Sequence, residues 1–140
     1  MLPHTELLKA LHTLFTTATG PASSLITVLS GNIFAYTAPV DTPTPYMTYN
    51  VRNGTNEFTF SDTIASLLLY VNVYDHSNSI ATMMNIGSAT ELLLDERKLT
   101  LGSGYTHVCN NLETTIGPLF PEENEIQITQ IFNNRIEYTK

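Results

Sequence analysis

The chain has 140 residues and a formal net charge of -7, from thirteen acidic and six basic residues. A chain of this length forms one domain that buries about 70% of the surface its unfolded form would expose, so it needs neither a metal nor a disulfide to fold. The six basic residues are scattered along the sequence, which disfavours a protein that grips nucleic acid but not an acidic wall past which DNA slides.

The N-terminal residues have the period of an amphipathic helix. At about 100° per residue, the apolar side chains fall on one arc, and they are Leu7, Leu8, Leu11, Leu14, Phe15 and Ala18. Pro3 before this pattern and Gly20-Pro21 after it predict a helix of about four turns. The apolar residues between 22 and 30, which precede Gly31, predict a second, short helix.

The next stretch is predicted to alternate between extended and irregular segments. The apolar run 33–36 predicts a short strand, and Pro39, Pro43 and Pro45 predict a surface connection without regular structure. Residues 46–51 resume the character of a strand. Asn53-Gly54 then predicts a turn, and we expect 57–62 to form a mobile hairpin or a long loop.

A strand and a helix follow. In 67–74 every odd position is apolar, which predicts a central strand with one buried face. The segment 77–94 predicts an amphipathic helix, with Ser77 or Asn78 as its capping residue and Gly87 packed closely against a neighbour. Its expected buried arc consists of Ile80, Met83, Met84, Ile86, Leu93 and Leu94.

The last third of the chain is predicted to be extended. Gly102-Ser103-Gly104 predicts a turn into a strand over 105–112, and 116–121 reads as a second connection marked by prolines. The segment 126–138 alternates apolar and polar residues and predicts a final strand. Helices and strands mixed in this order indicate a small α+β domain.

Few residues could carry catalysis. His107 and Cys109 would share one face of a strand as base and nucleophile, but no third group is at hand to orient the imidazole. Asp75 and His76 end a strand, where active residues are common. The histidines and the single cysteine lack the spacing of metal ligands, so we expect no enzyme, no metal and no cofactor. A small enzyme using Asp75, His76 or Cys109, or a ligand-binding domain, remains an alternative.

Nothing in the sequence points to a membrane. No stretch approaches the roughly 20 apolar residues that a membrane-spanning helix needs, and the N-terminus lacks the layout of a signal peptide. The single Cys109 excludes an intramolecular disulfide and suits a reducing compartment. We therefore expect synthesis and assembly in the cytoplasm.

The order of these elements resembles the tail completion or tail terminator proteins of long-tailed bacteriophages, which cap the tail tube and join it to the head. In the first half, the resemblance rests on the N-terminal helix, the segment 25–29 running into Gly31-Asn32-Ile33-Phe34, then Ala38-Pro39 and Pro45-Tyr46-Met47-Thr48-Tyr49. In the second half it rests on Leu69-Tyr70-Val71-Asn72-Val73-Tyr74-Asp75, the helix 79–94 and the strand that ends near Tyr138.

The resemblance implies a mixed, mainly antiparallel sheet with two main helices packed on one face, and no catalytic residues. It also implies a ring of six subunits in the tail or neck of a virion, with the tail tube protein and the head-tail connector as partners. DNA would pass through the lumen without sequence-specific binding. Six copies at -7 carry about -42, and an acidic lumen would repel the DNA backbone. Another connector or neck protein, or a tail assembly chaperone, is the nearest alternative.

Partner contacts are expected on loops and at exposed apolar positions. The region 53–66 supplies Glu57, Phe58, Phe60 and Asp62, and Leu92 lies off the buried arc of its helix. Glu122, Glu123 and Glu125 form an acidic run that could meet a basic partner surface. A closed ring of identical subunits joined head to tail uses two different patches per subunit, so these residues are candidates for one or the other.

Overall fold

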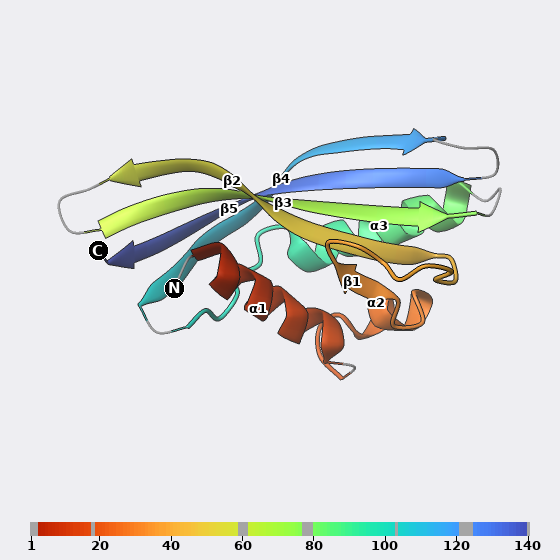
Figure 1. Cartoon of the computed structure of the whole chain (residues 1–140), viewed down its shortest axis with the longest axis horizontal. Helices are drawn as coiled ribbons and strands as arrows, with labels where there is room; N and C mark the ends of the chain where they lie inside the picture. The colour runs from red at the N-terminus through yellow and green to blue at the C-terminus, as the bar shows by residue number, and fades with distance from the viewer. Residues whose placement is uncertain are drawn as a thin grey trace.

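The computed structural model describes residues 3–17, 19–58, 62–76, 80–102, 104–120 and 125–139. The helices are α1 (Pro3–Thr16), α2 (Ser23–Val28) and α3 (Ile80–Leu94). The strands are β1 (Ile33–Ala35), β2 (Tyr46–Phe58), β3 (Asp62–Asp75), β4 (Tyr105–Leu119) and β5 (Ile126–Thr139). Figure 1 shows these elements along the chain. The helix predicted at the N-terminus, the short helix after it and the connection that holds the three prolines are all confirmed.

The strands form one mixed sheet in the order β1-β2-β3-β5-β4. Only β1 and β2 run parallel, and the other three neighbouring pairs are antiparallel. The sheet is strongly twisted, and the helices lie along one side of it (Figure 1). The predicted α+β fold, with a mainly antiparallel sheet and two main helices on one face, is confirmed.

The core lies between the helices and one face of the sheet. Odd-numbered residues of β3 and even-numbered residues of β5 point into it, because alternate residues of a strand face opposite sides. Among the largest fully buried side chains are Tyr49 and Phe132. The rings of Phe15 in α1 and Tyr49 in β2 lie 5.1 Å apart and join the first helix to the sheet.

The buried face of α3 differs from the predicted arc. Ile80 and Met84 are 45% and 50% exposed, so their assignment to the core is wrong. Gly87 and Thr90 are buried instead, together with Met83, Ile86, Leu93 and Leu94. The helix turns its small residues toward the sheet, and the side-chain amide of Gln130 in β5 donates to the Gly87 carbonyl at 2.9 Å.

Gly87 is a position where a larger side chain would fit. A Cβ built there would lie 3.7 Å from Nε2 of Gln130, which is an ordinary van der Waals contact. Since alanine favours a helix over glycine by about 1 kcal/mol, we expect Gly87→Ala to raise the free energy of unfolding by about that amount and the melting temperature by about 3 °C. Thermal melts followed by circular dichroism test this, with Ser88→Ala at the exposed neighbour as the control. A lower melting temperature for Gly87→Ala would show that α3 packs too closely on β5 to leave room for a methyl group at position 87.

Two predicted breaks in strands are wrong. The predicted turn at Asn53-Gly54 lies inside β2, where a shift in the register between Asn53 and Asn56 absorbs the irregularity and pairing with β3 continues to Phe58. Of the two alternatives predicted for 57–62, the hairpin is confirmed, because β2 and β3 pair antiparallel up to Phe58 and Thr63, and the region 53–66 is mostly a two-stranded ribbon. In the second predicted connection, residues 116–119 belong to β4, which continues to Leu119, and Phe120 follows the strand. Pro118 is tolerated there because β4 is an edge strand and can lack an N–H on its outer side.

Candidate assembly surfaces

The second face of the sheet is open in the part of the chain that the structure describes. Even-numbered residues of β3 and odd-numbered residues of β5 point to it, and most of them are half-buried. Hydrogen bonds between side chains of neighbouring strands order this face. The Ser66 hydroxyl donates to Oδ1 of Asn133 at 2.8 Å, and the Thr129 hydroxyl donates to Oδ1 of Asn72 at 2.7 Å. These bonds hold polar side chains in fixed positions on this face.

Aromatic and charged side chains complete the open face. The rings of Tyr46 and Tyr74 stack at 5.0 Å, and the guanidinium of Arg52 lies 4.2 Å above the centre of the Tyr70 ring. The register places Arg135 on this face beside β3. Because Arg52 and Arg135 stand here beside Glu113 and Glu137, the described part of this face is close to neutral and is not an acidic wall.

A groove of about 560 Å³ lies between α1 and the segment 97–102, which leads from α3 toward β4. Its floor is apolar and includes Ala10, Leu14, Pro21, Leu99 and Leu101. Its rim carries three of the six basic residues of the chain, which are Lys9, Arg97 and Lys98. The concentration of cations is notable in a protein with a net charge of -7.

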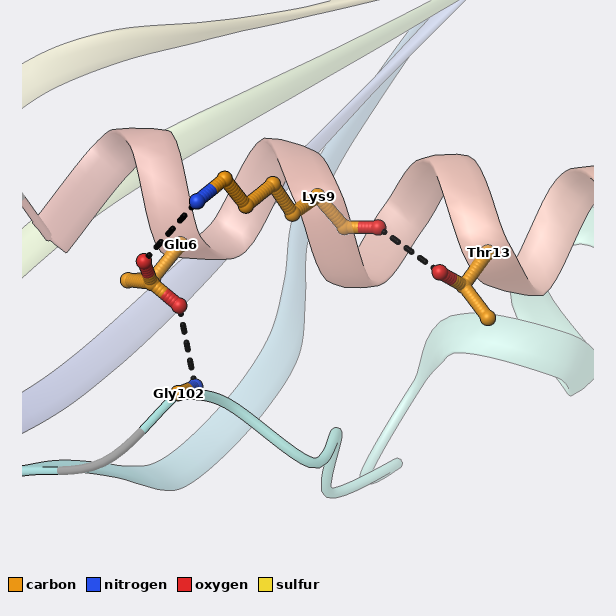
Figure 2. A network of polar contacts seen from close by, with 4 residues as sticks. All are labelled: Glu6, Lys9, Thr13 and Gly102. Carbon is orange, nitrogen blue, oxygen red and sulfur yellow. Dashed lines mark hydrogen bonds and ion pairs between the residues drawn. The ribbon is translucent and has the colours of Figure 1, made fainter.

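The buried carboxylate of Glu6 ties the two walls of this groove together (Figure 2). Its Oε2 accepts a hydrogen bond from the Gly102 amide at 2.9 Å, and its Oε1 pairs with the Lys9 ammonium at 3.4 Å. A Cβ at position 102 would overlap the carboxylate, so a larger residue there would displace the Glu6 side chain from this position. The chain thereby brings together residues that are 96 positions apart in sequence.

A buried histidine makes the second attachment of this segment. Nδ1 of His107 accepts a hydrogen bond from the Leu99 amide at 2.8 Å, and Nε2 lies 2.9 Å from Oδ1 of Asn134. Since Nδ1 is an acceptor, the proton of the neutral ring is on Nε2, which donates to Asn134. Burial lowers the pKa of His107, the hydrogen bond to Asn134 and a backbone contact at Cys109 oppose this, and Lys98 lowers it further.

The residues of the alternative catalytic sites do not converge. His107 lies opposite Ile136 on the helix side of the sheet, whereas Cys109 lies opposite Arg135 on the open side. The prediction that His107 and Cys109 share a face is wrong, because the β4 register shifts between them. Asp75 pairs with Ile126, nine positions from Arg135 along β5, which is roughly 30 Å from Cys109.

The described residues hold no other sign of a chemical centre. No three histidine, cysteine, aspartate or glutamate side chains gather among them in a way that could hold a metal ion. Within the same ranges, no helix has both the length and the apolar character to cross a membrane. The exposed His76 lines a polar hollow of about 500 Å³ beside Tyr46 and Tyr74, and Asp75 is buried.

The predicted contact residues divide into exposed, adjacent and undescribed ones. Leu92 is 84% exposed on α3, as expected for a side chain off the buried arc. Glu125 directly precedes β5, and burial followed by the charges of Tyr74 and Glu125 raises the pKa of Tyr46. The backbones of Glu57, Phe58 and Asp62 belong to the β2–β3 ribbon. The side chains of these three, and all of Phe60, Glu122 and Glu123, lie outside the described residues.

Sequence reasoning missed the groove. The four residues that charge or join its walls, Glu6, Lys9, Arg97 and Lys98, come from two segments that are about 90 positions apart, and neither segment has a motif. The one local sign in the sequence was that Arg97 and Lys98 are consecutive in a chain that has few basic residues.

Comparison with solved structures identifies proteins of the same fold. A chain from the virion of a native gene transfer agent (GTA) particle superposes with a TM-score of 0.73 and 15% identity, over 93% of this chain and 96% of that chain. A second solved structure, which carries no functional description, superposes with a TM-score of 0.63 and 8% identity, over 95% of this chain and 97% of that chain. No protein-family model and no curated protein matches the sequence. At these identities the likeness shows a shared fold.

Proposed function

We propose that this chain is a structural component of a phage-like virion, and more specifically a tail terminator that caps the tail tube as a six-subunit ring and joins the tail to the head. The observation that carries the proposal is the superposition with a chain of a gene transfer agent virion over nearly the full length of both chains. The order of elements in the sequence, which resembles that of tail terminators, supports the finer role independently of that superposition.

The surface of the protomer suits assembly. One face of the sheet has no helix over it in the described part of the chain, and Leu92 is almost fully exposed. Further apolar side chains stand exposed at the end of the edge strand β4, namely Ile116, Leu119 and Phe120. Exposed apolar groups at separate places on one protomer are typical of a subunit that contacts two neighbours.

The proposed partners follow from the role. They are further copies of the chain, the tail tube protein and the head-tail connector, with DNA passing through the lumen without sequence-specific binding. The net charge of -7 per copy supports a lumen that does not hold DNA, because a ring of acidic subunits repels phosphates. Arg52 and Arg135 of the open sheet face would attract phosphates, so a lumen that does not hold DNA requires this face to point away from it.

The nearest alternative is another neck or connector protein, or a tail assembly chaperone. A deletion of the gene from the genome that carries it, followed by electron microscopy of the particles, separates these roles. A terminator predicts filled heads beside detached, overlong or uncapped tails, and a plasmid copy of the gene restores joined particles. Heads without any tails would identify a chaperone or an early tail component. Intact particles would overturn the virion role and return the ligand-binding and enzyme alternatives.

Leu92 offers a test of assembly that leaves the fold intact. Because its side chain is 84% exposed, we expect Leu92→Asp to change the free energy of unfolding by less than about 0.5 kcal/mol while reducing the assembled fraction in size-exclusion chromatography. The matched control is Leu93→Asp at the buried neighbour, which should unfold the protomer. If Leu92→Asp assembles as well as the unchanged chain, Leu92 is not part of a subunit contact.

A further inference from the structure

The groove between α1 and the segment 97–102 has the chemistry of a docking site for an acidic segment that also carries an apolar side chain. Lys9, Arg97 and Lys98 contribute three positive charges, and Glu6 contributes one negative charge that Lys9 and Gly102 already engage. The groove therefore has a net charge of about +2 above an apolar floor. Nε of Arg97 donates to the Leu93 carbonyl at 2.5 Å, which uses one of the five N–H donors of its guanidinium.

The chain itself contains a segment that matches this groove. Residues 120–125 read Phe-Pro-Glu-Glu-Asn-Glu, with three carboxylates next to one aromatic residue. Phe120 is 62% exposed at the end of β4. An aromatic ring suits the apolar floor of the groove, and carboxylates suit its basic rim. We infer that the groove of one protomer binds the segment 120–125 of a second copy of this chain.

The fold makes this contact intermolecular. The groove is attached through Leu99 to His107, which pairs with Ile136, whereas the acidic segment ends at Glu125, directly before Ile126. Ile126 and Ile136 are ten positions apart, which separates the two regions by roughly 33 Å along β5. In Figure 1 the segment before β4 and the end of β4 lie toward opposite ends of the molecule. A protomer cannot fill its own groove with its own segment.

The consequence is a head-to-tail contact. Each copy offers the segment to one neighbour and the groove to the other, so the interface joins two different patches and repeats around a closed ring or along a filament. This inference rests on the proposed ring and names the contact that would close it. A short segment buries less area than a standard stable interface, so a single contact is weak and ring closure strengthens it.

Reversing the charge of the acidic segment gives a direct test. Docking in the groove and general charge repulsion predict opposite changes in the association of the copies. Glu122→Lys with Glu123→Lys changes the net charge from -7 to -3, since each substitution adds two charges. Lower net charge would strengthen association if repulsion between copies controlled it. Docking in the groove predicts the reverse, an increase of about tenfold or more in the dissociation constant. The readout is sedimentation velocity of the full chain at about 0.05 M and about 0.5 M salt.

The matched control and the rescue use the same full-length chain. Glu91→Lys with Glu113→Lys makes the same change in charge at exposed residues elsewhere, and it should leave association unchanged or strengthen it. Lys98→Glu in the groove should weaken association by about tenfold, because it adds repulsion against the acidic segment. The chain that carries Lys98→Glu, Glu122→Lys and Glu123→Lys together should regain association, since opposite charges again face each other.

Several results would overturn the contact. They are a wild-type chain that stays monomeric at low salt, a segment variant that associates as tightly as the wild type, or a combined variant no better than either parent. Association that follows net charge alone would overturn it too. These failures differ from failure of the proposed function. Aberrant tails after gene deletion, with association through another surface, would reject only the groove contact, whereas groove-dependent association with intact particles would reject only the virion role.

Discussion

Replacing Phe132 with alanine is expected to lower the free energy of unfolding by about 3–5 kcal/mol and the melting temperature by about 10–20 °C. The ring is fully buried in β5, the strand next to the centre of the sheet, and its register neighbours are Leu69 in β3 and Leu112 in β4. β3 and β4 flank β5 on its two sides, and α3 packs on its face. The surroundings therefore cannot close over the space that the ring leaves. Chemical denaturation followed by circular dichroism measures the loss.

The neighbouring residue on the opposite face is the control. Ile131 has its register partners in Tyr70 and Thr114 on the open side of the sheet. With no helix over that side in the described residues, water can enter the space left by Ile131→Ala, so we expect a loss below about 2 kcal/mol. Equal losses at the two positions would show that the open face is as tightly covered as the core.

The second large effect is a dependence of stability on pH that arises at His107. In the folded protein, burial lowers the pKa of its imidazole below the unfolded value of about 6.5. The unfolded chain therefore binds more protons than the folded chain once the pH falls below about 6.5, and stability decreases as the pH falls further toward the folded pKa. Well above about pH 6.5 the imidazole is neutral in both the folded and the unfolded chain, so His107 contributes no dependence of stability on pH. Protonation would also place an N–H on Nδ1 against the Leu99 amide, which is itself a donor.

The variant His107→Gln isolates this effect. Its amide cannot ionise but can both donate and accept, so the melting temperature should fall less between about pH 7.5 and pH 5.5 than that of the wild type. His107→Ala should instead cost about 2–4 kcal/mol at neutral pH, because it leaves the Leu99 N–H and the Asn134 oxygen without their partner. If wild type and His107→Gln lose stability in parallel on acidification, other groups control the response.

His107 also connects the core to the groove. Its bond to Leu99 holds the segment that carries Lys98, and the Glu6 carboxylate holds the same segment at Gly102. Two buried polar side chains therefore position a surface wall. A variant that breaks either bond should change association between copies as well as stability, which makes Lys98→Glu, an exposed change that touches neither bond, the cleaner probe of the contact.

The sequence alone determined where most of the helices and strands lie, and for α1 and β3 it also determined which face is buried. Leu7, Leu11 and Phe15 repeat at the period of a helix, and Leu69, Val71 and Val73 repeat at the period of a strand, because a segment that packs on one side carries its apolar residues at the repeat of its own backbone. Where the local pattern included a glycine or a proline, as at Gly54 and Pro118, it predicted breaks that pairing with a neighbouring strand overrode.

Only the tertiary structure decided which segments become neighbours. The strand order places β5 between β3 and β4, and this puts Pro118 of β4 at a tolerant edge. One shift in the β4 register turned Cys109 away from His107. The walls of the groove are joined because the Glu6 carboxylate binds the amide of Gly102, which is 96 positions later in the sequence. Periodicity in a sequence reports how each segment faces a core, whereas the pairing of distant segments depends on the summed energy of the whole packed arrangement, which no local pattern contains.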